Sequence, residues 1–175
     1  MKKILTTLSI IVSAQLSFSQ GDTPCAAVSL TPNASCTYTA GTTVGASYQS
    51  NAANGGTPSC ASPGAPDVWY SFVAPAGGTV TITTQAGTIT DGGMSLYSAT
   101  TCSTGLTQLA CNDDAVGLMP QINQSGLTAG ATYYIRVWKY SSGTGTFGIC
   151  ITLPAAPPAN DNCTGATLLV SNTSC

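Results

Sequence analysis

The sequence of 175 residues contains no histidine and no glutamate, and it carries only four Lys or Arg and six Asp side chains. The absence of histidine excludes Ser-His-Asp and Cys-His catalysis, and any zinc site built on imidazole. Soluble domains carry about a quarter charged residues, so a charged fraction of 6% also excludes long helices covered with ion pairs. Binding to nucleic acid is excluded because the only cations after Lys3 are Arg136 and Lys139, too few for a basic patch.

The abundant residues are threonine, with 27 copies, and glycine, with 19. Threonine, valine and tyrosine favour strands, whereas glycine, proline and asparagine favour turns. The mean hydropathy of +0.22 comes largely from alanine and other small residues, and the apolar residues of the mature part are scattered. The composition therefore predicts a β-rich domain, and we expect no membrane insertion of the mature chain.

The first 19 residues have the features of a signal peptide for export. Two lysines provide a positive start, residues 4–18 form an apolar stretch, and Ser17 and Ser19 are small residues before a cleavage site at Gln20. The stretch is too short and too often interrupted by polar residues to span a membrane well. We therefore expect a secreted or cell-surface protein with a mature net charge of −4, in an oxidising compartment that permits disulfides between its eight cysteines.

From residue 20 to about residue 154, short β-like runs alternate with segments rich in Gly, Pro, Ser and Asn. Arg136 alternates with apolar neighbours, which places it on the outer face of its strand. The run that contains Trp69 is apolar at successive positions, so we expect it to be buried on both faces or to show one aromatic to solvent. The pattern predicts an all-β fold, an antiparallel β-sandwich of jelly-roll or Greek-key type with about eight strands. The predicted strands are 35–48, 67–74, 78–85, 94–99, 107–111, 121–125, 131–140 and 144–153.

Two features predict that this domain is followed by a second copy. Residues 155–159, Ala-Ala-Pro-Pro-Ala, are typical of a semi-extended linker. The motif Cys-x-x-[Ala/Val]-[Ser/Thr]-Leu at 25–30 occurs again at 163–168, and each copy is followed by another cysteine, Cys36 or Cys175. Chance similarity of two short segments is the alternative. The predicted organisation is a signal peptide (1–19), a β-sandwich domain (20–154), a linker (155–159) and the truncated start of a second copy (160–175).

Longer motifs carry a resemblance to a known family. They are DVWYSFVAP at 67–75, GGTVTI at 77–82, MSLY at 94–97, LACNDD at 109–114 and GLTAGATYYIRV at 126–137. In this order and spacing, from about residue 22 to residue 153, the sequence resembles the bacterial pre-peptidase C-terminal-like β-sandwich domains. It is most similar to the cysteine-containing version found in tandem in proteins exported by the type IX system. Such domains are accessory modules of secreted peptidases, other hydrolases and adhesin-like proteins.

The resemblance implies a non-catalytic extracellular module that binds a ligand or spaces its neighbours in a larger secreted or cell-surface protein. The expected partners are an extracellular polysaccharide, a protein matrix or neighbouring domains of the same chain. The alternative is an accessory domain of a secreted peptidase or glycoside hydrolase whose catalytic part lies outside this sequence. Catalysis by the domain itself is not expected, because adjacent Asp113 and Asp114 would point to opposite sides of a strand, and glycoside hydrolysis needs two facing carboxylates.

A metal site is predicted where three oxygen-bearing side chains follow a strand, at Asn112, Asp113 and Asp114. Asp91 and Asp22 join them if the loops meet at one end of the sandwich. Calcium takes six to eight oxygen ligands, carboxylates among them, and few lysines are present to neutralise these acids. Calcium is therefore the one cofactor that we expect. The alternative is a turn, since Asn and Asp favour turns through hydrogen bonds between side chain and backbone.

Aromatic residues on the predicted strands offer a ligand platform, formed by Trp69, by Trp138 or by the pair Tyr133 and Tyr134. Trp138, with Tyr140 beyond it, is the best candidate for ligand binding because it lies next to a charged lysine near a strand end. The alternative is that these rings belong to the core, where aromatic residues on strands bury a large apolar area.

The six cysteines of the domain are predicted to form disulfides, and six cysteines allow fifteen pairings. The favoured pairs are Cys102–Cys111 across a hairpin, Cys25–Cys150 at the ends of the sandwich, and Cys36–Cys60; in the rival scheme Cys25–Cys36 and Cys60–Cys150 replace the last two. Each disulfide stabilises such a domain by about 2–4 kcal/mol. A redox role is not expected, because the sequence contains no Cys-x-x-Cys motif.

Overall fold

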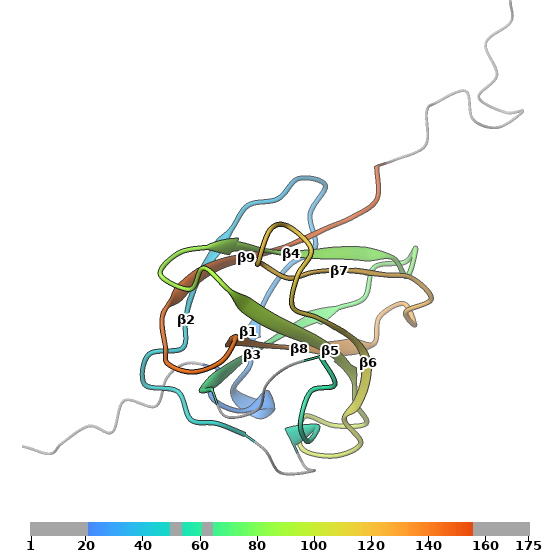
Figure 1. Ribbon diagram of the computed structural model, residues 1–175. Helices are drawn as coiled ribbons and strands as arrows, with labels where there is room; N and C mark the ends of the chain where they lie inside the picture. The colour runs from blue at the N-terminus through green and yellow to red at the C-terminus, as the bar shows by residue number, and fades with distance from the viewer. Residues whose placement is uncertain (1–20, 50–53, 61–64, 156–175) are drawn as a thin grey trace, which may run out of the picture.

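The computed structural model describes residues 21–49, 54–60 and 65–155, which form nine strands and one short 3₁₀ helix (Figure 1). The predicted signal peptide (1–19), the predicted second copy (160–175) and all but the first residue of the predicted linker (155–159) lie outside these described residues. In the described part of the chain, no helix is long and apolar enough to cross a membrane. The elements are η1 (Pro24–Ala26), β1 (Val28–Ser29), β2 (Thr39–Thr42), β3 (Asp67–Val73), β4 (Val80–Ala86), β5 (Gly92–Ser98), β6 (Thr107–Asn112), β7 (Gln121–Gln124), β8 (Thr132–Lys139) and β9 (Thr146–Thr152).

The strands form two sheets that pack face to face, seen as two layers in Figure 1. One sheet has five strands in the order β1-β3-β8-β5-β6, and the other has four in the order β2-β9-β4-β7. The strand pairs of the described residues are antiparallel except for the short parallel pair of β1 with β3. The prediction of an all-β, largely antiparallel sandwich is therefore confirmed.

Each predicted run contains a strand, and all but one agree with the observed ends within two residues. The exception is the run 35–48, of which only β2 is a strand. β2 ends at Thr42 because a turn follows it. In this turn Gly45 has a φ of +83° and the Ala46 N–H donates to the Thr43 carbonyl. β1 was not predicted, because two residues are too few to show an alternation.

The core between the sheets is built from residues that alternate along the strands. Phe147, Ile149 and Ile151 of β9 point inward and are buried, as are Val80 and Ile82 of β4. Threonine and glycine occupy most of the intervening positions, which face away from the core. Fully burying one large apolar side chain contributes about 1.5–3 kcal/mol, so this layer is the main source of stability.

The outer face of the five-stranded sheet is buried as well. Trp69 of β3, Tyr97 of β5 and Arg136 of β8 lie on this face and are at most 1% exposed. The described residues 43–49 and 54–60 cover them: the Tyr48 ring lies over the Arg136 guanidinium, and a Cβ at Gly55 would lie 2.6 Å from the Tyr97 ring. β3 is therefore buried on both faces, as one of the two expectations had it. Arg136 does face away from the core between the sheets, but a second layer covers it.

The six cysteines form three disulfides, but both predicted pairing schemes are wrong. The predicted bond from Cys102 to Cys111 fails because Cys102 lies in the loop between β5 and β6, whereas Cys111 lies opposite Ser95, four residues into β6. Four residues of strand span about 13 Å, and a disulfide needs Cα atoms within about 7 Å. The observed pairs are Cys25–Cys102, Cys36–Cys150 and Cys60–Cys111.

The other predicted pairs fail because they join opposite sides of the sandwich. Cys150 lies on the outer side of β9, next to β2, so its neighbour is Cys36, which precedes β2. Cys25 lies in η1, which contacts β3 of the other sheet, and packed sheets are about 10 Å apart. Cys60 belongs to the segment that covers the five-stranded sheet and cannot reach Cys150 either.

Candidate functional site

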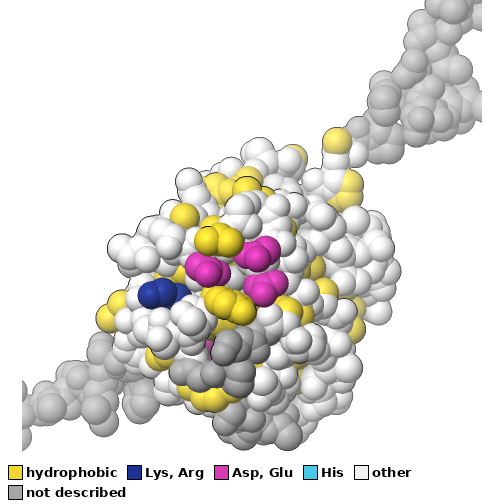
Figure 2. Space-filling view, in the orientation of Figure 1, with side chains coloured by type: hydrophobic (Ala, Val, Ile, Leu, Met, Phe, Trp, Pro, Cys, Tyr) yellow, Lys and Arg dark blue, Asp and Glu magenta, His cyan; other side chains and the backbone are white. Residues whose placement is uncertain are grey.

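Three of the predicted calcium ligands lie at one corner of the five-stranded sheet. Asp91 immediately precedes β5, and Asp113 and Asp114 follow the end of β6, the strand next to β5. Figure 2 shows acidic side chains gathered on one face with a basic side chain beside them. Lys139 lies opposite Gly92 in the register of β8 with β5, so this corner includes a cation that opposes binding of a metal ion.

The other two predicted ligands already have protein partners. Asn112 Oδ1 accepts the Gln121 N–H at 3.1 Å, and Asn112 Nδ2 donates to the Asp114 carbonyl at 3.4 Å. Asp22 accepts the N–H of Ser47 at 2.5 Å and lies beyond β3, so β3 and β8 separate it from β5. Among the described residues, no three His, Cys, Asp or Glu side chains are grouped so that they would hold a metal ion. The calcium site stays a prediction, and its five residues are not brought together.

The predicted tryptophan platform is wrong. Trp138 is 3% exposed, because its indole packs over Gly93, where a Cβ would lie 2.2 Å from the ring atom Cε2. Trp69 is fully buried and Tyr133 is buried too, so these rings follow the alternative in which they belong to the interior. Tyr140, just beyond the end of β8, is 36% exposed and remains accessible to a ligand.

A buried ion pair dominates the electrostatics of the described residues. Arg136 Nη2 donates to Asp67 Oδ2 at 2.7 Å, and both side chains are 1% exposed. Arg136 also donates to the Gly56 carbonyl at 2.7 Å and to the Gln49 carbonyl. The Gln49 N–H donates to Asp67 Oδ2 at 3.0 Å, and the guanidinium lies 5.4 Å from the centroid of the Trp69 ring. The pair therefore fixes the covering segment to β3 and β8.

The surroundings of this pair indicate a structural role. Burial raises the pKa of Asp67 above its ordinary value of 3.8, and the bonds from Arg136 and Gln49 offset part of that rise. Burial also raises the pKa of Tyr97. Asp67 Oδ1 and Arg136 Nε are buried without a hydrogen-bond partner in the described structure. Because solvent does not reach these groups, a substrate does not reach them either, and the pair holds the second layer in place.

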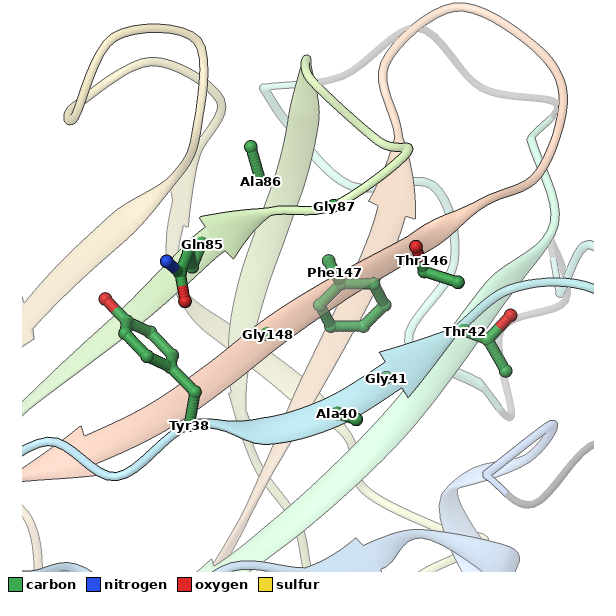
Figure 3. Close-up of a pocket in the computed structure, with 10 residues that line it drawn as sticks. All are labelled: Tyr38, Ala40, Gly41, Thr42, Gln85, Ala86, Gly87, Thr146, Phe147 and Gly148. Atoms are coloured by element: carbon green, nitrogen blue, oxygen red, sulfur yellow. The ribbon is translucent and has the colours of Figure 1, made fainter.

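An open groove of about 580 Å³ lies on the outer face of the four-stranded sheet. It crosses β2, β9 and β4, where Ala40, Gly148 and Gln85 form one row across the three strands. Small residues make up most of its floor, as the close-up in Figure 3 shows. The lining residues are Tyr38, Ala40, Gly41, Thr42, Gln85, Ala86, Gly87, Thr146, Phe147 and Gly148.

Tyr38 stands at the edge of the groove and is 42% exposed. It lies against Gly148, where a Cβ would be 3.2 Å from the Tyr38 Cβ. Cys36, two residues earlier in the chain, is bonded to Cys150 of β9, so the segment that carries Tyr38 is tied to the sheet. Figure 3 shows the Tyr38 ring and the Gln85 amide pointing toward one another.

The groove was not predicted from the sequence. Its glycines mark close packing within the protein: a Cβ would lie 2.3 Å from the Tyr70 hydroxyl oxygen at Gly41, 2.5 Å from the Thr146 carbonyl oxygen at Gly87 and 3.2 Å from the Tyr38 Cβ at Gly148. Glycine inside a strand often marks such a close approach. Tyr38 lies inside the predicted run 35–48, which is longer than the observed strand β2 and shows no pattern that predicts an exposed ring at this position.

Comparison with known proteins gives one family match and several similar structures. A family model described as galactose binding domain-like, and associated with type IX secretion, matches residues 25–151. The pre-peptidase C-terminal domain of a collagenase from Bacillus anthracis is similar, with 18% identity, 71% of this chain and 93% of that chain covered, and a TM-score of 0.47. No match was found among curated proteins.

Two further solved structures show a weaker likeness. The periplasmic inhibitor of g-type lysozyme from Aeromonas hydrophila shares 14% identity, with 71% of this chain and 97% of that chain covered and a TM-score of 0.39. The K1 cleaved adhesin domain of Lys-gingipain from Porphyromonas gingivalis shares 15% identity, with 66% of this chain and 71% of that chain covered and a TM-score of 0.32.

Proposed function

The chain belongs to the galactose-binding-domain-like family associated with type IX secretion, and on this premise we propose that it is a non-catalytic binding module of a larger secreted or cell-surface protein. The match over residues 25–151 confirms the family resemblance predicted from the sequence. An extracellular location is supported by the association of the family with an export system, and by three disulfides, which persist in oxidising compartments.

The groove over β2, β9 and β4 is the observation that carries the binding role. In the described part of the chain, the outer face of the five-stranded sheet is covered by its own segments, whereas the four-stranded sheet presents its groove to solvent. Sites built on strands hold their contacts more accurately than sites on loops. The volume of about 580 Å³ lies within the range of small-ligand pockets, about 300–1,000 Å³.

A sedimentation experiment with the full chain, secreted into an oxidising medium, tests the binding role. The purified protein is mixed with insoluble polysaccharides and, separately, with matrix proteins, and the fraction that sediments is measured. The control is the same protein after its disulfides have been reduced and alkylated. We expect at least one material to retain the oxidised protein and to release the reduced one. Failure of every material to retain the protein would contradict a binding role and would favour a spacer.

A further inference from the structure

We propose that one corner of the five-stranded sheet is a second interaction surface, which binds a polypeptide that presents apolar side chains together with Lys or Arg. This surface, the acidic corner, consists of Asp91, Asp113, Asp114, Val116, Leu118 and Tyr140. It lies away from the groove, which belongs to the four-stranded sheet, so the inference goes beyond the proposed function and does not depend on it. Two features carry it: an exposed apolar turn, and carboxylates without partners around that turn.

A tight turn between β6 and β7 holds two aliphatic side chains in solvent. The Val116 N–H donates to the Met119 carbonyl at 3.0 Å, and the Met119 N–H donates back to the Val116 carbonyl at 3.3 Å. Gly117 has a φ of +63°, which favours glycine at this position. The Met119 side chain is buried in the core and anchors the turn, whereas Val116 and Leu118 are 55% and 53% exposed. Covering these two side chains with apolar groups of a partner is therefore favourable.

Backbone hydrogen bonds join this turn to Asp91 and Tyr140. The Gly92 N–H donates to the Leu118 carbonyl at 3.0 Å, and the Tyr140 N–H donates to the Asp91 carbonyl at 3.0 Å. Among the described residues, seven large hydrophobic residues are exposed, and three of them, Val116, Leu118 and Tyr140, belong to the acidic corner. Single exposed apolar side chains are ordinary, but grouped ones mark interaction sites.

The carboxylates of the acidic corner have no partner within the described part of the chain. Asp22 and Asp67 bind other groups of the protein there, whereas no hydrogen bond or ion pair reaches the side chains of Asp91, Asp113 and Asp114. Figure 2 shows hydrophobic side chains beside and between the grouped acidic ones. An apolar centre with a polar rim is the usual anatomy of a protein interface, and the rim charges select a partner of the opposite sign.

This combination of charge and apolar surface favours a basic polypeptide over other occupants. The described acids are not grouped in threes as one metal ion needs, whereas several Lys or Arg side chains can each meet a separate carboxylate. A polyamine or an amino sugar supplies cations but no apolar side chains to cover Val116 and Leu118. A membrane surface with anionic lipids would be repelled.

The charge balance also argues against a second copy of this chain as the partner. Lys139 is the only exposed cation among the described residues, because Arg136 is buried. Lys139 lies beside the acidic corner but forms no ion pair with its acids. Three acids against one lysine leave a net charge of −2 at this corner. Two copies would therefore bring like charges together, whereas a basic partner gains attraction.

Titration of the ¹⁵N-labelled, oxidised full chain, followed by two-dimensional NMR, tests the proposal and locates the binding surface. The probe is a synthetic peptide with a central Leu-Leu-Leu run between two Lys-Lys pairs. One matched peptide carries Glu in place of every Lys, and another carries Ser in place of every Leu. Calcium chloride is titrated separately, because a metal ion is the competing occupant of the acids.

Two combined variants separate the charged rim from the apolar centre. The neutral variant is Asp91→Asn with Asp113→Asn and Asp114→Asn, and the apolar variant is Val116→Ser with Leu118→Ser. Val44→Ser is the control for the apolar variant, because Val44 is 59% exposed and lies after β2. Asp22→Asn is the control for the neutral variant. Near-UV circular dichroism checks folding, and the single substitutions replace a combined variant that is unfolded.

We expect the peptide with Lys and Leu to shift the amide signals of residues 91–92, 113–118 and 140, and to bind more tightly than either matched peptide. The neutral and apolar variants should each bind it about tenfold more weakly, through lost charge attraction and lost apolar burial. Both control variants should stay within about twofold. Raising the salt from about 50 to about 500 mM should weaken binding to the natural chain severalfold and affect the neutral variant little.

Unchanged binding by a folded neutral or apolar variant would overturn the proposal, as would equally tight binding of either matched peptide. Shifts confined to the groove, or no shifts up to millimolar peptide, would overturn it too. Shifts with calcium and none with peptide would assign the acids to a metal ion instead. The binding role of the groove is tested separately by sedimentation, so it stands whichever of these results is found.

Discussion

Replacing Arg136 with methionine removes the one buried cation of the described residues and keeps a side chain of similar length. Three bonds disappear: the ion pair to Asp67 at 2.7 Å and the hydrogen bonds to the carbonyls of Gly56 and Gln49. Removing one partner of a buried ion pair costs about 3–5 kcal/mol, because the other charge stays buried without compensation. Small domains are stable by about 5–15 kcal/mol, so this variant loses a large part of its free energy of unfolding.

The loss should depend on pH, because it acts through the carboxyl group of Asp67. Burial already raises the pKa of Asp67, and Arg136 is a group that lowers it, so the pKa rises further in Arg136→Met. An acid whose pKa is raised in the folded state stabilises the fold below its unfolded pKa, and that contribution is lost as the pH rises through the folded pKa. The variant should therefore be less impaired at pH 4 than at pH 7, by about 1.4 kcal/mol for each unit of further rise.

Urea unfolding at pH 4 and at pH 7, followed by tryptophan fluorescence, measures these losses. Both tryptophans are buried and report on unfolding, and urea does not screen charges as a salt would. Lys139→Met is the control, because it removes a half-buried cation from the same strand and should cost under about 0.5 kcal/mol. Asp67→Asn in the Arg136→Met background should restore stability at pH 7 and abolish the pH difference. Equal losses at the two pH values, or no restoration by Asp67→Asn, would refute the reasoning.

Four further predictions concern the cysteines, a buried tyrosine and calcium. Peptides cut by pepsin without reduction should link Cys25 to Cys102, Cys36 to Cys150 and Cys60 to Cys111, and a Cys102–Cys111 link would contradict the structure. Paired serine substitution at Cys36 and Cys150 should lower the free energy of unfolding by up to about 5 kcal/mol, because this disulfide closes a long loop with a sequence separation of 114 residues. A free energy of unfolding in urea within about 1 kcal/mol of that of the natural chain would show that the disulfide contributes little to stability. Burial raises the pKa of Tyr70 to about 12 from 10.0, so the fold should lose about 2.7 kcal/mol as the pH rises from about 10 to 12. Tyr70→Phe should remove this loss of stability at high pH. An alkaline unfolding transition that is unchanged in Tyr70→Phe would contradict the role of Tyr70. If Asp91, Asp113 and Asp114 hold the predicted calcium ion, the Tm should be several degrees higher in millimolar calcium than in chelator, and the same Tm in both solutions would contradict the site.

Alternation along the chain predicted the strands well, because a residue on a half-buried strand is selected for the face that it occupies. Phe147, Ile149 and Ile151 show this pattern clearly, and β9 was predicted within two residues at each end. The same pattern placed Arg136 on the outer face but could not show that it is buried. Whether an outer face is covered depends on a distant segment, here Tyr48 and its neighbours, and local periodicity contains no information about that segment.

The disulfides and the candidate site depend on which strands become neighbours in space. Cys36 and Cys150 are far apart in the sequence, and neither predicted scheme pairs them, because nothing in the sequence shows that β9 lies beside β2. The same order brings Tyr38 beside Gly148 and Gln85 to form the groove. Trp138 is a large ring near a strand end, which suggests exposure, yet Gly93 leaves a space that its indole fills.

The Cys36–Cys150 disulfide also determines how the domain responds to mechanical force. If the two ends of the domain are pulled apart, tension passes from Cys36 directly to Cys150. The chain between these two cysteines, which are separated by 114 residues in the sequence, then carries no load. Only residues 21–36 and 150–155, about 22 residues, can then be drawn out, which gives at most about 80 Å. Without that bond the Cys25–Cys102 disulfide would still shorten the path, and residues 21–25 and 102–155, about 59 residues, would extend to about 200 Å at about 3.3–3.6 Å per residue. A tandem array of such domains would therefore lengthen under flow only by these short end segments, with most of each domain shielded from the load.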